Sequence, residues 1–120
     1  MTVPQSEPLT TLNYAEALAF CDDDPELLRE IARSFQQTWP GQVAELQGAL
    51  TAGDARRFGH WAHALKSKAS VIAAGEVTRA ALELERLGRS GELSAAPAAR
   101  PTLMSALERL AQRLQQEDLV

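Results

Sequence analysis

The sequence predicts an all-α protein, built as an up-down four-helix bundle with a short additional helix at its N-terminal end. The composition is rich in Ala, Leu, Glu, Gln and Arg but only 5% aromatic, a mixture that favours helix. Apolar residues recur at spacings of three and four, with no strand-like alternation. The 120 residues suffice for one domain, expected over 10–117, after a flexible N-terminal tail over 1–9.

Composition and charge exclude several classes of protein. With 45% apolar and 23% charged residues, the chain has the composition of a soluble globular protein. Its net charge of −4 argues against a general nucleic-acid binder. No apolar run approaches the roughly 18–20 residues that span a bilayer. One cysteine, Cys21, has no internal partner for a disulfide, which fits the reducing cytoplasm.

The first two helices are expected in the N-terminal half. Apolar residues between 12 and 19 predict a helix of two or three turns. Asp24 is placed to cap a second helix, with Pro25 at its first position. Pro40 should interrupt this helix, yet the apolar spacing continues past it, which favours one long kinked helix over 25–51. Two shorter helices divided at Pro40 are the alternative.

Three further helices complete the predicted bundle. Gly53 is expected to end the long helix and Asp54 to cap the next, which should run from about 55 to 74 and close at Gly75. A fourth helix should then follow and end near 88–91. Small residues and two prolines predict a loop over 94–101, and leucines spaced by three and four predict a last helix after it.

The helix expected over about 55–74 has an unusual solvent face. Its apolar stripe includes Phe58, Leu65 and Ile72, and His63 lies about 130° from the middle of that stripe. The imidazole should therefore project into solvent. The neighbours expected on its face are all small: Gly59, Ser67, Ser70 and Ala74. Such a face lets another protein approach the ring closely.

This arrangement suits a phosphoryl group carried on histidine. An exposed imidazole is a competent nucleophile near neutral pH. Lys66, one turn further along, can reach an anion attached to the ring. The residues thus favour a phosphohistidine at His63.

The same residues carry a family resemblance. His63-Ala64-Leu65-Lys66, followed by Ala69, Ile72 and Ala74, is similar to the signature of histidine-containing phosphotransfer (HPt) domains of bacterial multistep phosphorelays. The Ala52-Gly53-Asp54 turn about ten residues upstream also fits, and the resemblance covers roughly residues 12–114. The chain departs from the family pattern at Ser67 and Ala73, where glycine is common, and at Lys68, where a small residue is common.

The resemblance implies that the chain is a phosphocarrier. His63 would accept a phosphoryl group from an aspartyl phosphate on a receiver domain and pass it to a second receiver, with Lys66 and Ser67 steadying the phosphoryl oxygens. Mg²⁺ would belong to the receiver, so no metal or other cofactor is expected in this chain. No kinase activity is expected, since the sequence has no nucleotide-binding motif. The partners would be response-regulator receivers and a hybrid sensor kinase, with the chain acting as a monomer.

A receiver would dock on residues around His63. We expect this docking set to comprise Gly59, His60, Ser70 and Ala74, with Leu12 and Ala15 from the first helix. The alternative function is a helical interaction module that sequesters a receiver or kinase without transferring phosphate, although such a binder needs neither His63 nor Lys66. A hydrolase would need a pocket and an orienting carboxylate, and a metal site a third ligand, none of which the sequence places on this face.

Overall fold

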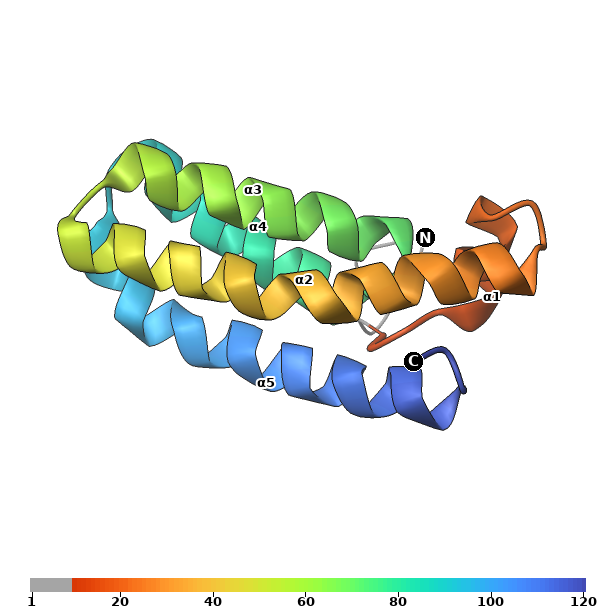
Figure 1. The fold of residues 1–120 in the computed structure, drawn as a ribbon. Helices are drawn as coiled ribbons and strands as arrows, with labels where there is room; N and C mark the ends of the chain where they lie inside the picture. The colour runs from red at the N-terminus through yellow and green to blue at the C-terminus, as the bar shows by residue number, and fades with distance from the viewer. Residues whose placement is uncertain (1–9) are drawn as a thin grey trace, which may run out of the picture.

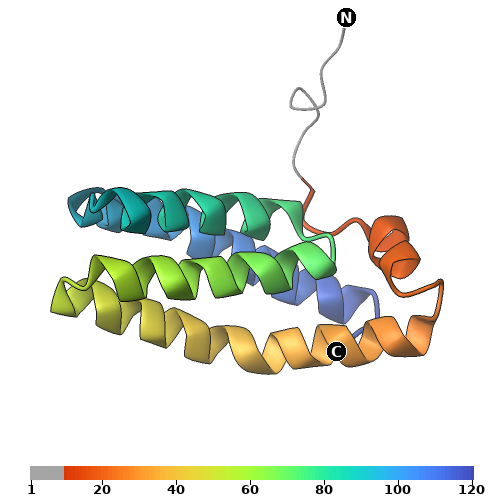
Figure 2. The same ribbon diagram turned by 90° about the horizontal axis from the view of Figure 1, so that it is seen from above.

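Helices account for most of the computed structural model, which describes residues 10–120. The described elements are α1 (Tyr14–Phe20), α2 (Pro25–Ala52), α3 (Ala55–Val71), α4 (Gly75–Ser90), a 3-10 turn (Leu93–Ala95) and α5 (Ala96–Gln116). Helices α2 to α5 run side by side in alternating directions, and α1 lies at one end of the bundle (Figures 1 and 2). This arrangement confirms the predicted up-down bundle with its short extra helix. The tail expected over 1–9 lies outside the described residues.

The long second helix is unbroken. α2 spans 28 residues with Pro40 inside it, so the prediction of one helix is confirmed over the alternative of two. Proline removes a backbone donor, which leaves the carbonyl one turn earlier without its helical partner. That carbonyl belongs to Gln36, which is only partly buried, so water can satisfy it.

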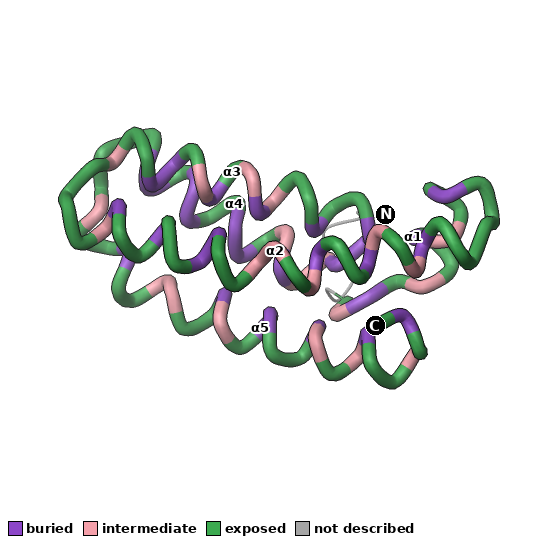
Figure 3. Tube along the Cα trace, in the orientation of Figure 1, coloured by how far each residue is buried: buried purple, intermediate pink, exposed green. Residues whose placement is uncertain are grey.

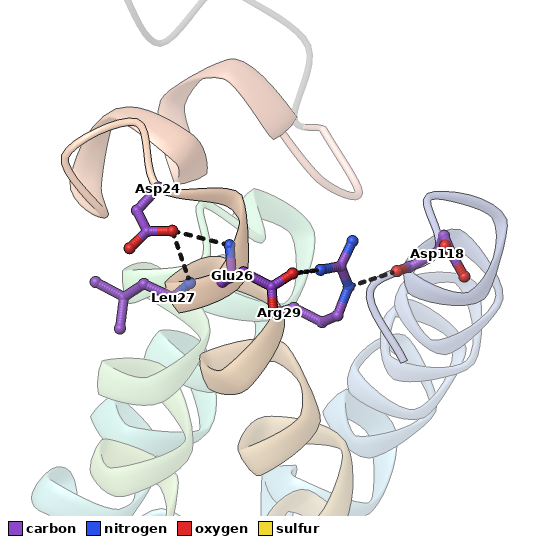
Figure 4. Close-up of polar contacts among 5 residues, drawn as sticks. All are labelled: Asp24, Glu26, Leu27, Arg29 and Asp118. Atoms are coloured by element: carbon purple, nitrogen blue, oxygen red, sulfur yellow. Dashed lines mark hydrogen bonds and ion pairs between the residues drawn. The ribbon is translucent and has the colours of Figure 1, made fainter.

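The predicted helix caps at both ends of α2 are also confirmed. The Asp24 carboxylate accepts hydrogen bonds from the backbone N–H groups of Glu26 and Leu27 at 3.0 and 3.4 Å (Figure 4). Gly53 ends α2 in the left-handed region, with φ of +69°, where glycine is unstrained. The Asp54 side chain then caps α3. These local signals fix where the chain reverses, so they fix the length of each helix.

Two boundaries differ from the prediction. α3 ends at Val71, and Gly75 begins α4 instead of closing α3. Ala73 reverses the chain between them with φ of +53°, which explains why glycine suits this position of the family pattern. The loop predicted over 94–101 is wrong: α5 begins at Ala96, because alanines favour helix and Pro97 falls in the first turn, where no backbone donor is needed.

Buried apolar residues from all the bundle helices form one core. Figure 3 shows the buried positions in purple along each helix. The stripe predicted for α3 is confirmed, since Phe58, Leu65 and Ile72 are at most 2% exposed. The C-terminal turn closes one end of this core. Arg29 of α2 donates from Nε to the backbone oxygen of Asp118 at 3.2 Å (Figure 4). The next residue, Leu119, is buried in the core.

Candidate functional site

His63 stands near the middle of α3, and its side chain is 51% exposed. The predicted outward orientation is therefore confirmed. The ring is nevertheless anchored on one side, because its Nδ1 lies 2.8 Å from Oε2 of Glu85 on α4. Helices α3 and α4 are neighbours in the bundle (Figure 1), so the contact joins two rigid elements.

Glu85 is the centre of a cluster of charges. Its side chain is only 3% exposed, yet three protonated or protonatable groups converge on it. Lys66 Nζ lies 2.8 Å from Oε1 as an ion pair, and an Arg89 guanidinium nitrogen lies 2.5 Å from Oε2. We call these four residues, His63, Lys66, Glu85 and Arg89, the Glu85 cluster.

The Glu85 carboxylate is ionised despite its burial. Burial alone raises the pKa of a carboxyl group, because it penalises the charged form. The contacts with Lys66 and His63 and the charges of Lys66 and Arg89 outweigh this penalty, so the pKa of Glu85 lies below its usual value. Glu85 is thus a fixed negative charge beside the His63 ring at neutral pH.

An ionised partner determines which nitrogen of His63 carries hydrogen. A carboxylate can only accept hydrogen bonds, so Nδ1 must be the donor in the 2.8 Å contact. The neutral ring then has its lone pair on Nε2, on the side away from Glu85. The described residues make no hydrogen bond to Nε2. The arrangement therefore presents Nε2 as a nucleophile.

Two glycines allow α3 and α4 to approach closely at this point. Gly59 of α3 faces Gly88 of α4, and a Cβ built on Gly88 would come within 2.7 Å of the Gly59 backbone. Gly59 lies one turn before His63, and Gly88 lies three residues after Glu85. The pair thereby sets the helix separation that brings Glu85 to the ring. Gly59 was expected on the exposed docking face, and this is wrong because the helix contact buries it.

An open hollow of about 590 Å³ lies beside His63. Its lining includes the cationic or protonatable side chains of Arg56, His60, His63 and Arg89, with Gly59 and Gly88 contributing only backbone. No acidic side chain lines it. The expectation that this face has neither a pocket nor an orienting carboxylate is therefore wrong: the neighbouring helix supplies Glu85 and one wall of the hollow.

The other residues predicted on α3 are exposed or paired. Lys66 lies on the expected side of His63 but is paired with Glu85. Ser67 and Ser70 are exposed, and the Ser70 hydroxyl donates to the Ser67 backbone oxygen at 2.8 Å. His60 is exposed one turn before His63, with its ring edge-to-face against Trp61.

The remaining residues predicted for docking, Leu12, Ala15 and Ala74, are partly buried as a group: two are covered and one is exposed. Leu12 is 3% exposed and Ala74 is fully buried, so neither is available to a partner, contrary to the prediction. Both are covered because the segment before α1 packs on the α3–α4 turn, where the Asn13 N–H donates to the Ala73 oxygen at 3.1 Å. Ala15 is exposed on α1, as expected.

Glu85 is the functional residue that sequence reasoning missed. Its position carries a signal, because it shares one face of α4 with Ala81 and Gly88, and both of these are buried. A glutamate on a buried helix face requires a charged or hydrogen-bonding partner. The sequence does not say which helix provides that partner.

Neither a metal-binding cluster nor a membrane-spanning helix occurs in the part of the chain that the structure describes. Within residues 10–120, no group of three or more His, Cys, Asp or Glu side chains could hold a metal ion. In the same part of the chain, no helix is both long and apolar enough to cross a bilayer.

The fold and the site define a class of protein: a helical bundle that presents on the surface of one helix a histidine anchored by a buried glutamate and flanked by cationic side chains. The model of the Hpt domain matches residues 30–117, and the chain therefore belongs to the Hpt domain family. It functions in histidine phosphotransfer in phosphorelays, in which such domains interact with receiver domains and hybrid kinases.

Solved structures agree with this assignment. Histidine-containing phosphotransfer protein B from Pseudomonas aeruginosa PAO1 is 25% identical, with a TM-score of 0.82 over 89% of this chain and 93% of that one. The HPT domain of a sensor hybrid histidine kinase from Shewanella has the same fold, at 21% identity and a TM-score of 0.71 over 91% of this chain and 97% of that one. No curated protein matches the chain.

Proposed function

We propose that His63 is the phosphorylated residue of this Hpt domain. Its Nε2 accepts a phosphoryl group from an aspartyl phosphate on one receiver domain and passes it to another. The observation that supports this most strongly is the 2.8 Å contact between Nδ1 and the ionised Glu85, which leaves the Nε2 lone pair on a half-exposed ring. His60, the other histidine of α3, has no such carboxylate contact among the described residues.

Cations near His63 would stabilise the transferring group. Phosphoryl transfer depends mainly on positioning and on neutralising the charge of the equatorial oxygens. Lys66 and Arg89 both lie within the Glu85 cluster, next to the ring. Ser67, exposed one turn after His63, is a further candidate contact for the phosphoryl oxygens. We infer that the chain acts as a carrier and has no kinase activity of its own.

The docking face surrounds His63. Ser67, Ser70 and His60 are exposed on α3, and Ala15 is a candidate contact from α1. The hollow beside His63 extends this face toward Arg56, and its positive charge suits the acidic surroundings of a receiver's phosphorylated aspartate. This set replaces the buried Gly59, Ala74 and Leu12. We propose response-regulator receivers and a hybrid sensor kinase as the partners, a monomeric state, and a cytoplasmic location.

Phosphoryl transfer from a panel of phosphorylated receivers tests the proposal. The acceptors are the wild type, His63→Gln and the matched control His60→Gln, which removes the other histidine of the same helix. Phosphate should appear on the wild type and on His60→Gln but not on His63→Gln. Phosphate on His63→Gln would refute the assignment. Tight receiver binding without transfer to the wild type would instead favour the interaction module.

A further inference from the structure

We propose that Glu85 is a positioning residue that keeps Nδ1 of His63 protonated throughout the transfer cycle and neutralises the ring cation that phosphorylation creates. The proposal rests on the proposed function, in which His63 carries the phosphoryl group. It assigns to Glu85 a chemical task beyond holding α3 and α4 together.

The electron balance of the reaction requires a charge beside the ring. When the Nε2 lone pair attacks phosphorus, the N–P bond forms, and the P–O bond to the donor aspartate breaks with its electron pair leaving on the aspartate. The ring, which keeps its proton on Nδ1, thereby becomes an imidazolium. The Glu85 carboxylate, 2.8 Å from Nδ1, is the anion placed to stabilise that cation.

The onward step needs the same proton in the same place. When the next receiver's aspartate attacks phosphorus, the N–P bond breaks and its electron pair returns to Nε2. A ring with Nδ1 protonated departs as neutral imidazole, whereas a ring without that proton must depart as an imidazolate anion, a far poorer leaving group. By holding the proton, Glu85 keeps the phosphohistidine transferable at neutral and mildly alkaline pH.

The surroundings make this effect large. Glu85 is 3% exposed, so its charge is weakly screened on the side of the protein. Other charges that face His63 act against it: Lys66 and Arg56 on α3, Arg89 on α4, and His60 when protonated. Each of these disfavours a cationic ring, so the proton on Nδ1 depends on Glu85.

Lys66 and Arg89 gain a second role in this scheme. Both contact Glu85 directly. A dianionic phosphoryl group on Nε2 would compete for them, and any shift of the two cations toward it would leave Glu85 more fully available to the imidazolium. The cluster is therefore arranged so that the new cation and the new anion each find a partner.

Glu85→Gln separates charge from hydrogen bonding. The glutamine oxygen can still accept from Nδ1, but the negative charge is gone. The matched control is Glu83→Gln, which removes one negative charge from the exposed side of the same helix, where Glu83 pairs with Arg86. Each protein is phosphorylated on His63, and transfer to an excess of receiver is measured from pH 6 to pH 9. The Nδ1 proton of each phosphohistidine is titrated by nuclear magnetic resonance over the same range.

Loss of the charge should shift the pH profile. We expect the titration midpoint of the phosphohistidine in Glu85→Gln to fall by at least about one pH unit. Transfer from this variant should then be about tenfold slower than from the wild type at pH 8. At pH 6, where both rings keep the Nδ1 proton, the two rates should agree within about twofold. Glu83→Gln should follow the wild type. An unchanged midpoint and an unchanged pH profile in Glu85→Gln would overturn the proposal and assign Glu85 a purely structural role.

Two further measurements keep the outcomes distinct. If Glu85→Gln fails to fold, the midpoint of the wild-type phosphohistidine is compared with that of a phosphorylated peptide covering residues 58–68, and the proposal requires the higher midpoint in the folded chain. If the wild type carries its phosphate on a residue other than His63, the proposed function fails first. Phosphate on His63 with no effect of Glu85→Gln refutes this inference alone.

Discussion

The contact between Gly59 and Gly88 should be the point at which a single methyl group most disturbs both the bundle and the site. In Gly88→Ala, the new Cβ would lie 2.7 Å from the Cα and N of Gly59 and 3.1 Å from the oxygen of Ala55. All three atoms belong to the backbone, so no side-chain rotation relieves the contact. Helices α3 and α4 must separate locally by about 1 Å to restore ordinary van der Waals distance.

The cost follows from this separation. Overpacking of this kind destabilises a protein by roughly 1–3 kcal/mol, and the better helix propensity of alanine returns about 1 kcal/mol of that loss. We therefore expect the free energy of unfolding to fall by about 1 kcal/mol. The same movement would lengthen the 2.8 Å contact between His63 and Glu85 to about 3.8 Å, which is too long for a hydrogen bond.

Gly59→Ala is the matched control for this prediction. A Cβ on Gly59 meets its nearest heavy atoms at 3.7 Å, an ordinary contact, and alanine favours the helix. Its free energy of unfolding should stay the same or rise by up to about 1 kcal/mol. Urea denaturation of both variants and the wild type measures the difference. Equal stability of Gly88→Ala and Gly59→Ala would refute the close approach of α3 and α4.

Two further predictions concern charge. Arg56→Glu should slow phosphoryl transfer about threefold to tenfold at low salt and less at high salt, because Arg56 lines the hollow beside His63. The control Arg33→Glu makes an equal charge change on the exposed side of α2 and should leave the transfer rate unchanged. Equal effects of the two substitutions would contradict a local role of Arg56. Burial of Glu76 opposes its ionisation, but contacts with Arg109 and Thr11 outweigh this effect and lower its pKa below the usual 4.5. The ionised Glu76 therefore stabilises the folded chain at neutral pH, and this contribution is lost as the pH falls below about 4.5. Glu76→Gln should therefore lower stability at pH 7 and flatten the acid-induced loss in denaturation measured from pH 7 to pH 3; an unchanged pH dependence would contradict this.

The sequence allowed the fold to be predicted because its signals are local. Asp24, Gly53 and Asp54 determine helix ends through their own side chains and backbone angles, and the apolar spacing determines which side of each helix is buried. The same spacing correctly oriented His63 outward. The errors at 94–101 and at Gly75 arose because Pro97 and Gly75 are compatible both with a loop and with the first turn of a helix, while Pro101 lies inside α5.

The site was predicted only in part, because half of it comes from another helix. His63 and Lys66 are neighbours on α3, and their spacing alone brings them together. Glu85 reaches them only through the packing of α4 on α3, and that packing depends on a pair of glycines 29 positions apart in the sequence, Gly59 and Gly88. Reasoning from a single helix face treated Gly59 as free surface, whereas tertiary contact makes it part of the core.

The position of the phosphoryl group within the His63 ring tests the central claim most directly. Nitrogen and phosphorus resonance spectra of the ¹⁵N-labelled chain, recorded before and after phosphorylation by a receiver, assign both ring nitrogens of His60 and His63. The account predicts hydrogen on Nδ1 of His63 in both states and phosphorus bonded to its Nε2. Phosphorus on Nδ1 of His63, or on either nitrogen of His60, would contradict it.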